Sequence, residues 1–119
     1  MSDDVKLFRS EKYIHVLFCN ENAGPFAIGE KLNALNPEAY MNGYNWDALF
    51  RYYLSKHAPE VLEGLESDPE AGMFAAYYAP SDENWKKAEK FSEIITYLLE
   101  NEDVLCRLVQ EEGGCIEWD

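Results

Sequence analysis

The chain has 119 residues, of which 47% are apolar and 14% aromatic, a size and composition typical of one folded domain with a substantial core. Its net charge of −13 disfavours nucleic acid and anionic membranes as partners, because binding to either relies on Lys and Arg. Residues 61–119 carry 15 acidic and 4 basic residues, so this half would attract a basic partner.

The sequence has no signals for membrane insertion or disulfide formation. No run approaches the ~20 apolar residues that cross a bilayer, and the start MSDDVK lacks the apolar stretch of a signal peptide. The three cysteines, Cys19, Cys106 and Cys115, have unpatterned spacings that indicate reduced thiols. We therefore expect a cytoplasmic protein, whose acidic charge serves either a basic partner or solubility alone.

The first part of the chain predicts a β-hairpin followed by a helix. Residues 5–9 and 12–19 have strand patterns, and the second segment is largely apolar on both faces, which favours an interior strand. Residues 20–24 have the composition of a turn. Pro25 suits the first position of a helix over residues 25–35, which ends before the next proline.

The clearest predicted helix follows a turn at residues 41–45. Its apolar residues recur at i, i+3, i+4, i+7 and i+8, and they are Trp46, Leu49, Phe50, Tyr53 and Leu54. We expect Asn45 to cap this helix, and Asp47 complements the helix dipole in its first turn. Pro59 then begins a short second helical segment.

The second half of the chain predicts a strand over residues 73–79, a helix over residues 83–100 and a shorter helix behind it. Gly113-Gly114 ends the last helix, and residues 115–118 are expected to form a short terminal strand. Strands and helices therefore interleave irregularly. We predict an α+β fold in a single domain, residues 1–119, with a small antiparallel or mixed sheet of about three or four strands covered by about four helices.

Three carboxylates, Glu66, Asp68 and Glu70, precede the strand predicted at residues 73–79. Paired carboxylates can act as general acid and base, so a small carboxylate-based enzyme is one interpretation. No Ser-His-Asp set and no calcium-loop spacing accompanies them, and no Lys or Arg lies near them for a phosphate. Asp-Pro followed by Gly is a turn signal, so we expect residues 68–72 to form a solvated turn.

Metal and phosphate sites lack their usual sequence signatures. His15 and His57 are far apart, and no His or Cys pair has the spacing of zinc ligands. Gly113-Gly114 leads into no helix, so it does not predict a phosphate-binding loop. We expect neither a metal nor a cofactor.

Three tyrosines fall outside the apolar stripes that account for most aromatic residues. Tyr40 and Tyr44 lie in predicted loop and turn segments, and Tyr52 lies beside the stripe of its helix. An exposed tyrosine near carboxylates is typical of protein-binding surfaces, because it combines apolar area with a hydrogen-bonding tip.

Two motifs connect the chain with a known family. NGYNWDALFRYYL, followed some twenty residues later by DPEAGMFAAYY, resembles the Immunity protein 51 family of bacterial polymorphic toxin systems, and the likeness extends over about residues 12–110. The residues that match the family motifs are Gly43, Tyr44, Trp46, Asp68, Pro69, Glu70, Ala71, Gly72 and Phe74. The resemblance implies a small intracellular protein that binds and neutralises a cognate toxin, without catalysis or a cofactor.

The resemblance and the charge together lead to a specific hypothesis about the site. We expect a basic toxin to bind an acidic, tyrosine-containing surface made of Tyr44, Asp47, Tyr52, Glu66, Asp68 and Glu70. The other motif residues are expected to be structural, with Gly72 supplying a positive φ, and they are Gly43, Trp46, Pro69, Gly72 and Phe74. A nuclease toxin would fit because its cleft is basic. The alternatives are an acidic nucleic-acid mimic that inhibits another nuclease, and the carboxylate-based enzyme.

Overall fold

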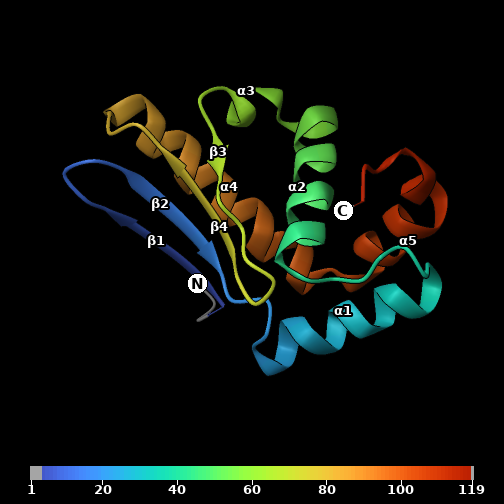
Figure 1. Ribbon diagram of the computed structural model, residues 1–119. Coiled ribbons are helices and arrows are strands. Elements are labelled where there is room, and N and C mark those ends of the chain that lie inside the picture. The colour runs from blue at the N-terminus through green and yellow to red at the C-terminus, as the bar shows by residue number, and fades with distance from the viewer. Residues whose placement is uncertain (1–3, 119) are drawn as a thin grey trace.

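The computed structural model describes residues 4–118, and within them the strands form one antiparallel sheet (Figure 1). Its four strands lie in the order β1-β2-β4-β3, and they are β1 (Val5–Arg9), β2 (Ile14–Phe18), β4 (Phe74–Tyr78) and β3 (Glu66–Ser67). The predicted α+β class is confirmed. The interior position of β2, between β1 and β4, is also confirmed, and it explains why β2 is apolar on both faces.

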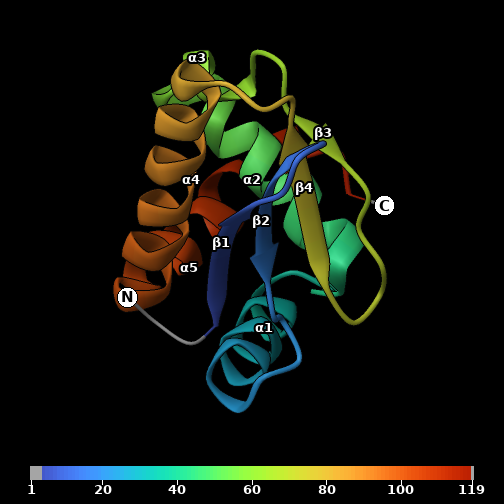
Figure 2. The same cartoon turned by 90° about the vertical axis from the view of Figure 1, so that its left-hand side faces the viewer.

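Helices α2 and α4 pack against one face of the sheet, and in Figure 2 α2 lies behind β2 and β4 while α4 stands beside β1. In chain order the helices are α1 (Ala23–Leu35), α2 (Gly43–His57), α3 (Pro59–Leu62), α4 (Asp82–Glu100) and α5 (Glu102–Glu112). A short 3-10 helix, Gly113–Cys115, follows α5. Helix α4 contacts β1 and β2, and α2 contacts β4, so the core lies between this helical layer and the sheet.

Burial alternates along both central strands, and the buried residues of β2 and β4 all point toward the helices. Aromatic rings fill this layer with centroids 4.9–5.8 Å apart, mostly in edge-to-face contacts, and they belong to Phe18, Trp46, Phe50, Phe74 and Phe91. Such pairs add about 0.5–1.5 kcal/mol each beyond their buried area. The ring cluster therefore fixes α2 and α4 against the sheet.

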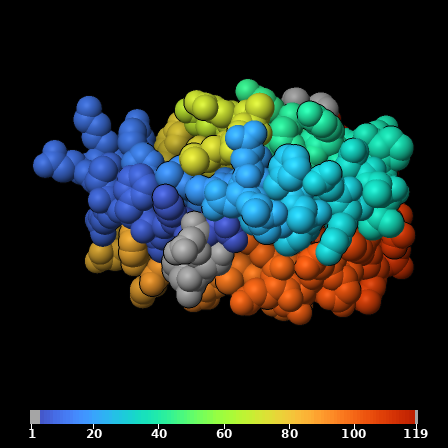
Figure 3. Space-filling model, turned by 90° about the horizontal axis from the view of Figure 1, so that it is seen from below, coloured from blue at the N-terminus to red at the C-terminus, as the bar shows by residue number. Residues whose placement is uncertain are grey.

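The loop between β3 and β4 packs against the connection from β2 to α1. Figure 3 shows the yellow loop residues beside the light-blue residues of that connection. The Asn20 side chain donates a hydrogen bond from Nδ2 to the Ala71 carbonyl at 3.2 Å, and Asn20 is itself buried. A Cβ on Gly72 would lie 2.7 Å from Glu21 Oε1. The Glu21 side chain is flexible and exposed and could move aside, so this contact alone does not require glycine at position 72.

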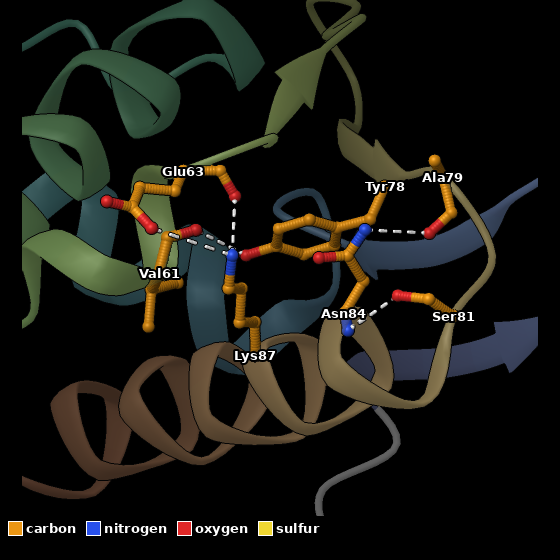
Figure 4. A network of polar contacts seen from close by, with 7 residues as sticks. All are labelled: Val61, Glu63, Tyr78, Ala79, Ser81, Asn84 and Lys87. Atoms are coloured by element: carbon orange, nitrogen blue, oxygen red, sulfur yellow. Dashed lines mark hydrogen bonds and ion pairs between the residues drawn. The ribbon is translucent and has the colours of Figure 1, made fainter.

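A polar network fixes the end of β4 to α3 and α4 (Figure 4). The buried Tyr78 hydroxyl donates to the Val61 carbonyl at 2.5 Å, and burial raises the pKa of Tyr78, so this group remains a donor. Lys87 Nζ donates to the Glu63 carbonyl at 3.2 Å. The Ser81 side chain caps α4, as its position before the helix predicts.

Several local predictions were wrong, and each has a physical reason. Residues 115–118 form no strand, because the chain turns in a 3-10 helix and the Trp118 indole donates back to the Gly113 carbonyl at 3.0 Å. Helix α2 is capped by Asn42, whose Oδ1 accepts from the Asn45 amide at 2.9 Å. The Asn45 side chain instead donates to the Tyr40 carbonyl.

Three further differences concern the start of α1, the glycine with a positive φ, and strand β3. Helix α1 begins at Ala23, two residues before Pro25, which still lies in the first turn where its missing N–H costs nothing. Within residues 4–118 the positive φ belongs to Gly64, at 80°, and not to Gly72. The strand β3 was not predicted at all, because two residues carry no readable alternation.

Candidate functional site

The six predicted binding residues lie on two surfaces that meet at β3. Tyr44, Asp47 and Tyr52 belong to α2 and line a hollow of about 530 Å³ between this helix and the C-terminal segment, which we call the α2 hollow. Its other lining residues are Ala48, Arg51, Ser55, Cys115, Glu117 and Trp118. Glu66, Asp68 and Glu70 lie along β3 and the loop after it, which we call the acidic edge.

A hydrogen-bonded network joins the two surfaces. The Ser67 hydroxyl of β3 donates to Asp47 Oδ1 at 2.7 Å, and Arg51 Nε donates to the same oxygen at 3.2 Å. Arg51 Nη2 also donates to Ser67 Oγ. The Asp47 side chain is 21% exposed and already has two donors. It therefore holds β3 against α2, and its charge is largely compensated by Arg51.

Tyr52 connects α2 with the end of α5. Its hydroxyl donates to Glu112 Oε1 at 2.5 Å. This hydrogen bond to a carboxylate, together with partial burial, raises the pKa of Tyr52 to about 12. The hydroxyl is therefore neutral at ordinary pH and remains committed to Glu112. Tyr44, by contrast, is 41% exposed, so its ring is more accessible than that of Tyr52.

The acidic edge is held by its backbone and leaves its carboxylates in solvent. Glu66 pairs with Tyr77 of β4, and the Asp68 amide donates to the Ala75 carbonyl at 2.9 Å. The Glu70 amide donates to the Met73 carbonyl at 2.8 Å. All three carboxylates are exposed, and none takes part in an ion pair within residues 4–118. The edge therefore presents uncompensated negative charge.

The two sequence motifs contact each other directly at Gly43. The Gly43 amide donates to the Ala71 carbonyl at 2.8 Å, and a Cβ on Gly43 would lie only 1.8 Å from the Glu70 carbonyl oxygen. Trp46 and Phe74, from the same two motifs, are both fully buried and belong to the ring cluster. The motifs thus place the loop that carries the acidic edge against the start of α2.

Sequence reasoning missed the partners that organise these surfaces. Arg51, Ser67 and Glu112 had no signal of their own, because their importance depends on contacts between segments 16 to 60 residues apart. No group of three or more His, Cys, Asp or Glu side chains within the described residues is arranged to hold a metal ion. None of the helices in that part of the chain is long and apolar enough to cross a membrane.

Exposed carboxylates beside an exposed tyrosine are typical of a protein that binds another protein. The family model of Immunity protein 51 matches residues 5–113, and the chain belongs to this family. The family is one of immunity proteins, which implies neutralisation of a toxin. The comparisons with curated proteins and with solved structures gave no match.

Proposed function

We propose that this protein neutralises a basic toxin by binding it through the acidic edge and the adjoining mouth of the α2 hollow. The observation that carries the proposal is the set of three exposed carboxylates, Glu66, Asp68 and Glu70, none of them ion-paired within residues 4–118. Such charges interact favourably with Lys and Arg of a partner without first breaking an internal ion pair.

The distribution of charge supports a basic partner. Residues 61–119 carry 15 acidic and 4 basic residues, and the acidic edge lies within them. Charges of one sign on one surface speed the encounter with an oppositely charged partner, at rates that fall as salt screens them. A nuclease is the toxin class that fits best, because its substrate cleft must be basic to hold phosphates. The carboxylates would then occupy positions that phosphates otherwise take.

The tyrosines give the proposed surface its short-range contacts. Tyr44 is exposed and offers an apolar ring with a hydroxyl that is available to a partner. Tyr52 keeps its hydroxyl on Glu112 and would contribute through its ring. Asp47 is held by Arg51 and Ser67 and would support β3 more than it contacts the toxin. Charge is thus expected to set the association rate, and Tyr44 the dissociation rate.

The experiment measures association of the purified protein with the toxin domain encoded by the neighbouring gene, by surface plasmon resonance over a range of salt concentrations. Glu66→Lys combined with Asp68→Lys should slow association about tenfold at low salt and flatten its salt dependence. The matched control is Glu89→Lys combined with Glu93→Lys, which makes the same charge change at exposed positions of α4. Equal slowing by both pairs would show that only net charge matters, and would place the toxin elsewhere.

A further inference from the structure

The sheet has one face without helices, and this open face faces the viewer in Figure 2. Helices α2 and α4 contact the other face, where the buried residues of β2 and β4 lie. Two side chains near the open face are large, apolar and exposed, Phe8 at 44% and Tyr13 at 43%. Soluble monomers rarely leave a contiguous apolar patch uncovered, and large ones mark interaction sites.

Strand register defines what lies on this face, because directly paired residues point to the same side of a sheet. The first row crosses the sheet at Lys6, Leu17, Ala75 and Asp68. Leu17 pairs with Lys6 on one side and with Ala75 on the other. The Ala75 carbonyl in turn accepts a hydrogen bond from the Asp68 amide. Leu17 and Ala75 are half-buried at its centre, and the two charged ends are exposed.

The second row runs Phe8, His15, Tyr77 and Glu66 by the same pairing. The Phe8 ring stacks on the His15 ring with centroids 4.5 Å apart. Tyr13, at the hairpin end, meets Tyr77 edge-on with centroids 4.9 Å apart. These contacts hold the exposed rings in place before any partner arrives, which lowers the entropy lost on binding.

Both rows end at β3 in a carboxylate of the acidic edge, Asp68 in one and Glu66 in the other. The open face therefore has an apolar and aromatic centre with a charged rim, which is the usual arrangement of a protein–protein interface. Ser67, between the two carboxylates, points to the opposite side of the strand and bonds Asp47. Strand β3 thus separates the open face from the α2 hollow.

We propose that the toxin bound at the acidic edge also covers the open face of the sheet, an inference that extends the proposed function and rests on it. The partner's surface has an apolar centre that covers Leu17, Ala75 and the rings, and Lys or Arg side chains that meet the acidic edge. Lys6 adds a cation at the β1 side of this face, which fits a carboxylate of the partner. The rings of the open face add to the affinity that Tyr44 contributes, and the acidic edge fixes the orientation.

Charge favours this occupant over a second copy of the chain. The two rows carry one cation, Lys6, against two carboxylates, Glu66 and Asp68, so two such faces stacked together would leave an excess of negative charge. Each chain also carries a net charge of −13, which adds repulsion between copies. A basic partner removes both costs.

The test places a bulky side chain at the centre of the open face. The Ala75 side chain lies on the open face of β4. The longer side chain of Ala75→Arg would therefore extend into solvent above this face and leave the core unchanged. The matched control is Ala34→Arg, the same substitution at an exposed position of α1. A second variant, Phe8→Thr, removes a ring and keeps a residue that favours strands.

Affinity for the neighbouring gene's toxin domain is measured by calorimetry, and folding of each variant is checked by its thermal melt. Ala75→Arg and Phe8→Thr should each weaken binding about tenfold or more, while Ala34→Arg binds like the wild type. Wild-type affinity for both open-face variants would overturn this inference and leave the proposed function intact. A wild-type protein that binds no toxin would instead overturn the proposed function. Light scattering that shows a dimer broken by Ala75→Arg would assign the face to a second copy and overturn the inference.

Discussion

Replacing Gly43 with alanine should destabilise the protein, because this glycine lies directly against another segment of the chain. A Cβ at this position would lie 1.8 Å from the carbonyl oxygen of Glu70 and 2.8 Å from that of Met73. Both oxygens belong to the backbone, so no side chain can rotate away to make room. The Gly43 amide also donates to the Ala71 carbonyl at 2.8 Å, and a displaced loop would lengthen this hydrogen bond.

The size of the effect follows from three opposing contributions. Overpacking against a fixed neighbour costs about 1–3 kcal/mol, and a weakened backbone hydrogen bond costs about 1 kcal/mol more. Alanine is the better helix former and offsets up to about 1 kcal/mol of this loss at the first residue of α2. The two losses sum to about 2–4 kcal/mol, so after the helix gain we expect Gly43→Ala to lower the free energy of unfolding by about 1–4 kcal/mol, and the melting temperature by roughly 5–15 °C.

The assay is urea unfolding followed by tryptophan fluorescence, to which the fully buried Trp46 contributes. Gly24→Ala is the matched control, because a Cβ on Gly24, in the first turn of α1, would meet no atom within 4 Å. This control should unfold at the same urea concentration as the wild type or a slightly higher one. If Gly43→Ala unfolded together with Gly24→Ala, the close contact between the two motifs would not exist as described.

Two further predictions concern tyrosine hydroxyls. Tyr78→Phe removes the donor to the buried Val61 carbonyl, and it should lower the free energy of unfolding, measured with urea, by about 1–2 kcal/mol. The control Tyr77→Phe, on the open face, should change this free energy by less than about 0.5 kcal/mol. Equal losses in the two variants would contradict the hydrogen bond from Tyr78 to Val61. Because the pKa of Tyr52 is raised to about 12, its bond to Glu112 contributes stability that is complete below pH ~10, the pKa of an unfolded tyrosine, and is lost as pH rises toward 12. Tyr52→Phe should therefore flatten the fall in stability over this alkaline range, and unchanged pH curves of unfolding would refute the role of Glu112.

Much of the fold could be predicted, because strong periodicity reports burial directly. The strand at Val5–Arg9 was predicted with its observed bounds, and the predicted strand at residues 73–79 contains β4. The stripe that begins at Trp46 identified α2, since the core selects one side of a helix. These elements bury enough apolar surface for their pattern to be visible in the sequence alone.

The failures lie where a specific contact or turn outweighs the preference that the residue pattern indicates. The segment that ends at Trp118 has apolar residues, but the indole bond to the Gly113 carbonyl folds it back instead of extending it. Gly72 has turn composition, yet its φ is not positive, and the nearest atoms to a Cβ at this position belong to the exposed Glu21 side chain. The Trp118 contact spans only five residues, but it depends on the 3-10 turn at Gly113–Cys115, which the apolar pattern of the segment does not report.

In the candidate site too, the residue types could be predicted from the sequence, whereas the contacts between them could not. The acidic edge could be proposed from the sequence because its three carboxylates are close together in the chain. Its position beside α2 depends on Ser67 and Arg51, and its continuation into the open face depends on the pairing of Glu66 with Tyr77. Strand register is not readable from a two-residue strand, so the open face could not have been found without the structure.

Neutralisation itself is tested most directly by survival of cells that express the toxin domain of the neighbouring gene, with and without this protein. Co-expression of the wild-type protein should restore growth, and the Ala34→Arg variant should restore it equally. Co-expression of Ala75→Arg should leave most cells dead although the variant is folded and present at the same level. Equal killing with and without the wild-type protein would contradict the assignment of toxin neutralisation to this chain.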